Sequence, residues 1–163
     1  MKPGYNSSYP NLMEVRLVAG NYMSSLHAKK SFFKGEVIAD LALSRPAAQK
    51  TRFTVQVEAD EHIELNSDLV YMNHSCDPNV AFDILQQRVV ALQDIDVGSE
   101  LTFFYPSTEW DAEEPFECRC GSKNCLKLFS GAKSIATEVL GKQLYISPHI
   151  WKLVKKRDEL ERM

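Results

Sequence analysis

The four cysteines of the chain are the residues whose spacing most clearly predicts chemistry. Cys118, Cys120 and Cys125 lie within the eight residues CRCGSKNC, and Cys76 lies upstream in the segment NHSCDPN. Structural zinc takes four ligands in a tetrahedron, at ~2.3 Å for each sulfur. The trio can supply three of these ligands, and Cys76 would complete the set.

Two disulfides or four unrelated buried thiols are the alternatives to a zinc site. Sulfurs one residue apart pair badly with each other, and free cysteines rarely cluster this closely, so the spacing favours zinc. The binding free energy of a structural zinc, ~10–16 kcal/mol in small peptides, adds to folding. One structural zinc ion would therefore hold residues 116–130 against residues 73–79.

Composition limits what kind of protein positions these cysteines. With 163 residues, 44% hydrophobic residues and a formal net charge of -3, the chain reads as one globular domain without a wide basic field. Without a basic field, we expect no direct nucleic-acid binding. We also expect no membrane partner, because no window has the ~18 apolar residues of a spanning helix. The N-terminus lacks the apolar core of a signal peptide, so the sequence predicts an intracellular protein, nuclear or cytoplasmic.

Short strands separated by turn residues are the dominant pattern. In residues 52–59, Phe53, Val55 and Val57 alternate with Thr54 and Gln56, which predicts a strand with one buried face. Residues 79–85 and 88–106 repeat the alternation, with a turn at 96–99. The apolar positions expected to share a face in these segments are Val80, Phe82 and Ile84, then Leu101, Phe103 and Tyr105.

Only the C-terminal part of the sequence reads as helical. A short helix closed by Gly141 is expected around residues 135–141, and a second helix from Ser147 and Pro148, a cap followed by proline in the first turn. The residues expected to be buried are Ile135, Val139 and Leu140, then Ile150, Trp151 and Val154. The run Lys155, Lys156, Arg157 is expected on the outer side.

Three motifs in fixed order carry a family resemblance. YMNHSCDPNV, GSELTFFYP and CRCGSKNC together resemble a SET-domain protein lysine methyltransferase with a cysteine-rich post-SET tail, and HAKKSFFKGEVIADL resembles the first strand pair of that family. The resemblance covers residues 13–130. It implies a mainly β fold, the SET-domain β-clip of short strands, in which the Asn-His-Ser-Cys segment forms a pseudoknot that brings Cys76 to the zinc.

On this resemblance the chain divides into four parts. Residues 1–12 are expected as a flexible lead-in, 13–110 as the SET domain, 111–131 as the post-SET zinc segment and 132–163 as a C-terminal helical extension. The implied cofactor is S-adenosylmethionine, and the implied catalytic residue is Tyr105. The implied cofactor-binding residues are Ser25, Leu26, His27, Tyr71, Asn73, His74, Phe116 and Leu126. The implied substrate-channel residues are Phe103, Leu41 and Trp110.

The implied reaction methylates the ε-amine of a lysine. That amine must be neutral to attack, and deprotonating it at pH 7 costs roughly 4.6 kcal/mol from a pKa of ~10.4. An apolar channel and a nearby sulfonium both lower this pKa. The resemblance also implies that a phenylalanine at position 103 leaves room for di- or trimethylation.

Several residues depart from the family pattern. Met23, Ser24 and Ser25 stand where a Gly-x-Gly is expected, with Gly20 before them. The other replacements are Leu41 for a tyrosine, Val70 for an arginine and Phe104 for an acidic residue. A zinc-stabilised SET-like binding module with weak or no catalysis is therefore an alternative to an active enzyme.

The substrate is open at this point. The expected partner is a lysine-containing protein or peptide, such as a histone tail, and a non-histone peptide or another amine is the alternative. Acidic residues between the tyrosine and the cysteine trio could attract a lysine-rich peptide or form an ordinary solvated loop. They are Glu109, Asp111, Glu113, Glu114 and Glu117.

Overall fold

The structure is a computed structural model that describes residues 6–19 and 24–163. Short β-strands make up most of its regular structure, as the sequence predicts. The strands are β1 (Met13–Arg16), β2 (Ser25–Ala28), β3 (Val37–Asp40), β4 (Arg45–Pro46), β5 (Thr54–Glu58), β6 (Glu61–Glu64), β7 (Asn73–His74), β8 (Val80–Asp83), β9 (Arg88–Ala91), β10 (Thr102–Phe103), β11 (Phe116–Glu117) and β12 (Leu128–Phe129).

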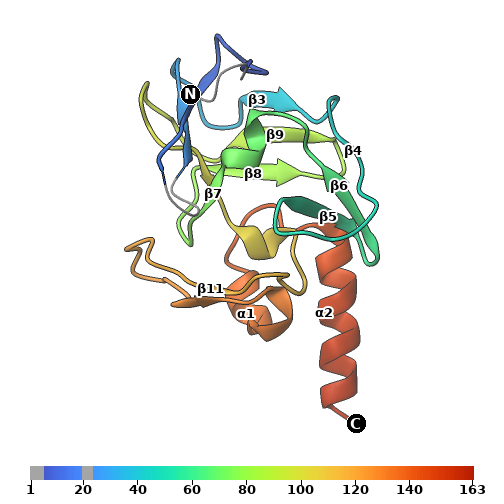
Figure 1. Cartoon of the computed structure of the whole chain (residues 1–163). Coiled ribbons are helices and arrows are strands. Elements are labelled where there is room, and N and C mark those ends of the chain that lie inside the picture. Colours follow the sequence, from blue (N-terminus) through green and yellow to red (C-terminus); the bar gives the residue numbers. More distant parts are fainter. Residues whose placement is uncertain (1–5, 20–23) are drawn as a thin grey trace.

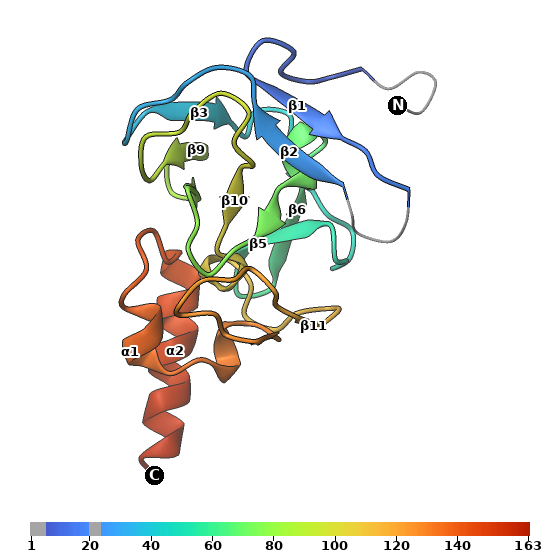
Figure 2. The same ribbon diagram turned by 90° about the vertical axis from the view of Figure 1, so that its left-hand side faces the viewer.

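The helical elements are short apart from the last one. The 3-10 helices are η1 (Asp68–Tyr71), η2 (Tyr105–Ser107) and η3 (Ala132–Ser134), and the α-helices are α1 (Thr137–Leu140) and α2 (Pro148–Glu161). No helix in the described ranges is long and apolar enough to cross a membrane. The strands form the body of the molecule, while β11, α1 and α2 lie below it and α2 extends away from it (Figures 1 and 2).

The strands form several small sheets rather than one large one. Two three-stranded antiparallel sheets have the orders β3-β9-β8 and β4-β6-β5, and β1 pairs with β2 alone. In a pair of their own, β10 and β7 run parallel, with Thr102 opposite Asn73 and Phe103 opposite His74. Parallel neighbours need a crossover connection. Here that connection contains the β8–β9 hairpin, so residues distant in sequence meet at β7 and β10.

Two hydrophobic cores meet at the end of β10. Phe103 belongs to the first core, between the sheets, and Phe104 belongs to the second, between the cysteines and α2. Other members of the first core are Leu26, Phe82, Val89 and Leu101, and other members of the second are Cys118, Leu140, Ile150 and Val154. Tyr105 therefore follows directly on the boundary between the two cores.

The burial of side chains in and next to strand β5 differs from the expected pattern. Phe53 is 56% exposed, whereas Thr54 and Gln56, expected to face solvent, are 6% and 4% exposed. The reason is that this face is also covered: the Trp110 N–H donates to the Gln56 side-chain oxygen at 2.9 Å, and α2 packs against β5. A strand buried on both faces does not show simple alternation.

The C-terminal helices begin near their expected positions, but three side chains differ from expectation. Trp151 is 37% and Val139 38% exposed rather than buried. Arg157, expected to face outward, turns inward and donates hydrogen bonds to the carbonyls of Ala132, Lys133 and Ile135. The carbonyls of η3 and of the residue after it thus receive a cationic donor that the charged run did not reveal.

The described part of the N-terminal lead-in is held against the body. The Asp68 carboxylate accepts hydrogen bonds from the Ser7 hydroxyl at 2.6 Å and the Ser8 N–H at 3.1 Å. Tyr9 and Leu12 pack against the first core. Residues 7–12 thus contact the body of the domain, while the expected division of the chain at residue 12 stays a prediction.

Candidate active site

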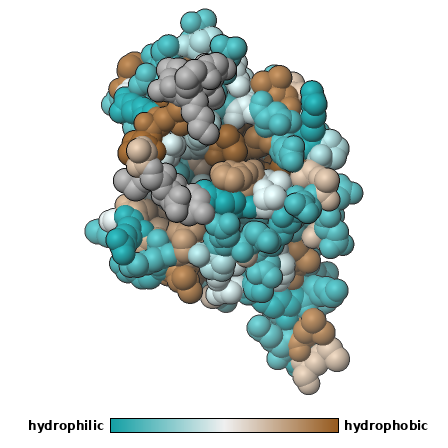
Figure 3. Space-filling view, in the orientation of Figure 1, coloured by the Kyte–Doolittle hydropathy of each residue, from teal (hydrophilic) through white to brown (hydrophobic). Residues whose placement is uncertain are grey.

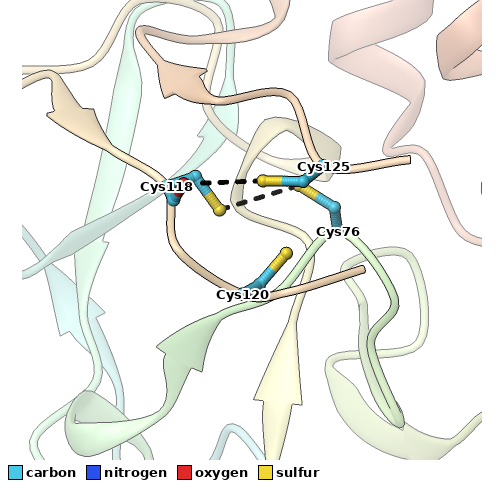
Figure 4. Close-up of side chains that lie close together, drawn as sticks. All are labelled: Cys76, Cys118, Cys120 and Cys125. Atoms are coloured by element: carbon cyan, nitrogen blue, oxygen red, sulfur yellow. Dashed lines mark hydrogen bonds between the residues drawn. The ribbon is translucent and has the colours of Figure 1, made fainter. Parts of the chain in front are cut away.

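The four cysteines converge, as their spacing predicts. Their sulfur atoms all lie within 4.8 Å of one another, and the sulfurs of Cys76 and Cys118 are 3.8 Å apart (Figure 4). A tetrahedral zinc with bonds of ~2.3 Å has sulfur–sulfur edges of about 3.8 Å. The donor set and its spacing therefore fit a zinc ion.

Backbone donors around the cluster are also arranged for sulfur anions. The Leu126 N–H points at the sulfur of Cys76 at 3.3 Å, and the Lys127 N–H points at that of Cys125 at 3.4 Å. Burial raises the pKa of the Cys76 thiol, and it raises that of Cys118 to about 11. Without a cation these two thiols stay protonated, so metal binding here would release protons.

One imidazole ring links the cysteine cluster to Tyr105. The Tyr105 N–H donates to Nδ1 of His74 at 3.1 Å, and Nε2 of His74 lies 3.3 Å from the sulfur of Cys76. Because Nδ1 accepts, the neutral ring carries its proton on Nε2 and donates toward the sulfur. Burial lowers the pKa of His74 to about 4, which keeps the ring neutral at physiological pH.

The Tyr105 hydroxyl is held by a backbone carbonyl next to strand β7. It donates to the carbonyl oxygen of Met72 at 2.8 Å, the residue that precedes β7. Burial raises the pKa of Tyr105, so the phenol remains neutral. A neutral hydroxyl at a defined point can orient an amine, but it cannot act as an anionic base.

Aromatic rings surround this tyrosine. The Tyr105 ring centroid lies 4.7 Å from that of Phe103, 5.5 Å from Phe129 and 6.2 Å from Phe116. The His74 ring stacks on Phe129 at 5.6 Å. Phe116 is 40% exposed, so part of its ring is accessible to a bound molecule. These rings supply the apolar surroundings that lower the pKa of an amine.

The expected cofactor-binding residues come from several segments, of which β7 pairs directly with β10. The Asn73 amide donates to the carbonyl of Ser24 at 3.0 Å and to the Glu100 carboxylate at 3.0 Å. On β2, His27 contacts the Ser25 hydroxyl at 2.8 Å and the Gly98 carbonyl at 2.9 Å. Leu26 is fully buried between these polar contacts. Tyr71 packs against the first core and Leu126 against the second.

The surface beside these elements has a mixed character. Most of the face in Figure 3 is hydrophilic, but hydrophobic residues gather in a hollow in its upper half. Met23 and Gly20, the expected substitutes for glycine in the cofactor loop, lie outside the described residues.

Comparison with known proteins agrees with this arrangement. The sequence model of the SET domain matches residues 24–106. Methyltransferase flvH of Aspergillus flavus is 41% identical over 145 residues, which are 88% of this chain and 81% of that protein. The chain belongs to the SET-domain methyltransferase family. The matched region ends at Pro106, directly after Tyr105, so the cysteine trio and α2 lie beyond it.

Other relatives share only part of the chain. A histone-lysine N-methyltransferase of Aspergillus oryzae, H3 lysine-4 specific, is 40% identical over 62 residues, 34% of this chain and 5% of that protein. An H3 lysine-36 specific enzyme of Candida albicans is 29% identical over 89 residues, 48% of this chain and 10% of that protein. This chain thus corresponds to a small part of these larger proteins.

A solved structure shares the fold. KRYPTONITE in complex with mCHH DNA, an H3(1-15) peptide and SAH superposes with a TM-score of 0.53 at 22% identity, over 71% of this chain and 29% of that chain. At this identity the likeness concerns the SET-domain fold alone.

The expected channel residues of the SET domain do not all meet. Phe103 contacts Tyr105, and Leu41 lies 7% exposed in the first core, against which Tyr105 packs. Trp110 packs instead with the second core, 5.9 Å from the Arg157 guanidinium, and lines an open groove along α2. Phe103 is therefore a direct neighbour of the tyrosine, Leu41 shares the core on which the tyrosine packs, and Trp110 belongs to the other core.

The acidic residues after Tyr105 are largely paired within the chain. Asp111 forms an ion pair with Lys133 at 2.8 Å, Glu114 with Arg52 at 3.5 Å and Glu117 with Arg119 at 2.9 Å. Lys50 also donates to the Asp111 carbonyl. An edge whose carboxylates already have cationic partners attracts a basic peptide weakly.

Two contacts at the site were not predicted from the sequence. The Met72 carbonyl receives the Tyr105 hydroxyl, and Glu100 receives the Asn73 amide. Glu109 was expected only as part of the acidic edge, but burial raises its pKa to about 7, although the Gln56 N–H donates to it at 2.8 Å. Contacts between separate segments such as these depend on the tertiary fold, which local pattern does not encode.

Proposed function

We propose that this SET-domain protein transfers a methyl group from S-adenosylmethionine to the ε-amine of a lysine. The supporting observation is the Tyr105 hydroxyl, buried among aromatic rings and held by the Met72 carbonyl at 2.8 Å. A neutral hydroxyl in an apolar site can align the neutral amine, and alignment alone lowers the barrier of a bimolecular transfer.

The residues beside Tyr105 fit the cofactor chemically. Asn73 offers an amide next to the backbone of β2, and Phe116 offers a partly exposed aromatic face for a purine. When bound, S-adenosylmethionine supplies a methyl group on a positively charged sulfur. The SAH bound in the KRYPTONITE complex is consistent with this proposal.

The chain's own residues would divide the work as follows. Tyr105 orients the amine, Phe103 and Phe129 exclude water from it, and His74 holds the tyrosine backbone. One zinc ion on the four cysteines would act as scaffold, because it joins residues 118–125 to the segment that carries His74. None of its ligands faces the transfer in this scheme.

A protein lysine is the first substrate that we propose. Relatives named for histone H3 lysine-4 and lysine-36 share 34% and 48% of this chain, and the KRYPTONITE complex contains a histone H3 peptide. Histone H3 is therefore the first substrate to test.

A lysine-like amine in a short peptide or small molecule is the second candidate. Two observations favour it: the acidic edge is neutralised internally, and Lys50 and Arg52 join that edge to the β5 side. In addition, the relative that matches 88% of this chain is named Methyltransferase flvH, without a histone in its name.

The deciding experiment offers methyl-labelled S-adenosylmethionine with histone H3, a short lysine peptide and free lysine in parallel. We expect label on an ε-amine of at least one substrate, located by mass spectrometry, and loss of that label with Tyr105→Phe. If no substrate is labelled and calorimetry detects no heat with the cofactor, the protein is a binding module instead.

A further inference from the structure

Buried polar residues concentrate where Tyr105 meets the start of α2. The tyrosine turn (residues 105–108) contains Ser107 and Thr108, which are 3% and 0% exposed. Across from it lie Ser147 and His149, which are 3% and 1% exposed. Burying polar groups is unfavourable unless they are hydrogen-bonded, so the bonds that they make at this junction matter for the fold.

Two hydrogen bonds join the tyrosine turn to α2. The Ser147 N–H donates to the Ser107 carbonyl at 2.9 Å, and Nε2 of His149 lies 2.8 Å from the Thr108 carbonyl. A carbonyl only accepts, so Nε2 of His149 carries the proton. Nδ1 of the same ring is buried without a hydrogen-bond partner, so the ring is held through its Nε2 side alone.

The tyrosine turn is held from its other side by β7. The Tyr105 N–H donates to His74, and the Tyr105 carbonyl accepts from the Thr108 N–H at 3.1 Å and the Thr108 hydroxyl at 3.3 Å. Strand β10 ends at Phe103, so no strand ladder fixes Tyr105 itself. Its backbone is therefore held by His74 on one side and, on the other, by the Glu109 N–H at 3.0 Å and by Thr108, whose own carbonyl contacts His149.

Helix α2 is firmly attached and can serve as a support. Ile150, the neighbour of His149 in the helix, is 0% exposed in the second core. Further along the helix, Arg157 donates to the carbonyls of Ala132 and Ile135. The position of His149 is thus fixed by the packing and hydrogen bonds of the residues that follow it in α2.

We propose that His149 is a positioning residue for the methyl transfer: its Nε2–H holds the Thr108 carbonyl and thereby sets the place of the Tyr105 hydroxyl. This inference rests on the proposed function. It gives the C-terminal helix, which lies beyond the SET-domain match, a role in the reaction. A misplacement of about 1 Å in an aligning group can lower a rate by about 100-fold, so a support at this point has a kinetic effect.

The test compares two isosteric variants of His149. The terminal amide nitrogen of glutamine lies near the place of Nε2, whereas that of asparagine does not reach it. We expect His149→Asn to lower kcat by about 10- to 100-fold, with little change in calorimetric affinity for S-adenosylhomocysteine or in zinc content. We expect His149→Gln to restore most of the wild-type kcat.

Val154→Ala is the matched control, because it removes packing from the same helix without touching the tyrosine turn. It should lower the melting temperature and leave kcat unchanged. If His149→Asn and Val154→Ala lower stability alike and both retain kcat, His149 is only structural and the proposal is wrong.

Hydrogen exchange provides a readout that does not need turnover. In His149→Asn, the amides of residues 105 and 107–109 should exchange faster than in Val154→Ala, while β8 and β9 stay protected. Unchanged exchange at these amides would refute the positioning role even if no substrate were ever found. Increased exchange without any methylation would instead reject the proposed function, while the conclusion that His149 holds the tyrosine turn in place would stand.

Discussion

Nε2 of His74 lies 3.3 Å from the sulfur of Cys76, and Nδ1 of the same ring accepts the backbone N–H of Tyr105 at 3.1 Å. One neutral imidazole therefore spans the distance between the cysteine cluster and the tyrosine. Any change in the place of Cys76 is passed to the residue proposed to align the amine.

Zinc removal should affect both stability and activity. We expect elemental analysis to find about one zinc per chain, and Cys76→Ser or a strong chelator to lower the melting temperature by at least on the order of 10 °C. Ser122→Ala, within the same loop but outside the cluster, is the control and should leave zinc content unchanged. Freshly purified protein without zinc would contradict the assignment of the four cysteines.

Loss of the Tyr105 hydroxyl should affect turnover rather than binding. Tyr105→Phe removes the donor to the Met72 carbonyl but keeps the ring contacts, so we expect kcat to fall about 100-fold or more with cofactor affinity nearly unchanged. Steady-state kinetics and calorimetry separate the two quantities. Tyr145→Phe removes a hydroxyl from a 42% exposed side chain and serves as the control. Full activity of Tyr105→Phe would remove this residue from the mechanism.

The size of the ring at position 103 should set the number of methyl groups. Phe103 is 6% exposed, with ring centroids 4.7 Å from Tyr105 and 4.5 Å from Phe82, so little space is left around it. We predict di- or trimethylated product for the natural chain and a shift toward monomethyl product for Phe103→Tyr, which adds a hydroxyl. Mass spectrometry of the product distribution measures this shift, and an unchanged distribution would argue against it.

Glu109 should make stability depend on pH. Burial raises its pKa from 4.5 to about 7, so the folded chain retains a proton that the unfolded chain releases. Its contribution is present below pH 4.5 and is lost as the pH rises through 7, by roughly 3 kcal/mol.

The corresponding variant is Glu109→Gln, which stays neutral and can still accept the Gln56 N–H. We expect it to raise the melting temperature at pH 8 and to change little at pH 4.5. Glu113→Gln, at an exposed carboxylate, is the control. Equal melting temperatures of Glu109→Gln and the natural chain at pH 8 would show that Glu109 is not held in a low-polarity site.

The site motifs could be read from the sequence because their chemistry restricts residue type. Zinc ligation needs thiolates at close spacing, so Cys118, Cys120 and Cys125 predicted a partner, and Cys76 is found beside them. The neighbours Asn73 and His74 were named through the order of the motifs. Their positions next to β10 agree with that reading.

Residues whose roles depend on tertiary contacts could not be predicted from the sequence. The alternation in residues 53–57 predicted a strand with one face exposed to solvent. In the structure, α2 and residue 110 cover the face that carries Gln56. Arg157 looked like part of a solvated charge run, yet its guanidinium satisfies carbonyls near η3. His149 belongs to no recognisable motif, because its proposed role depends on where helix α2 packs against the residues that follow Tyr105.

Phe103 and Phe104 are consecutive residues that anchor opposite cores. The two halves of the molecule cannot slide or hinge apart without pulling on the peptide bond that joins these rings. We therefore expect unfolding followed by tryptophan fluorescence and by far-ultraviolet circular dichroism to coincide in one cooperative transition.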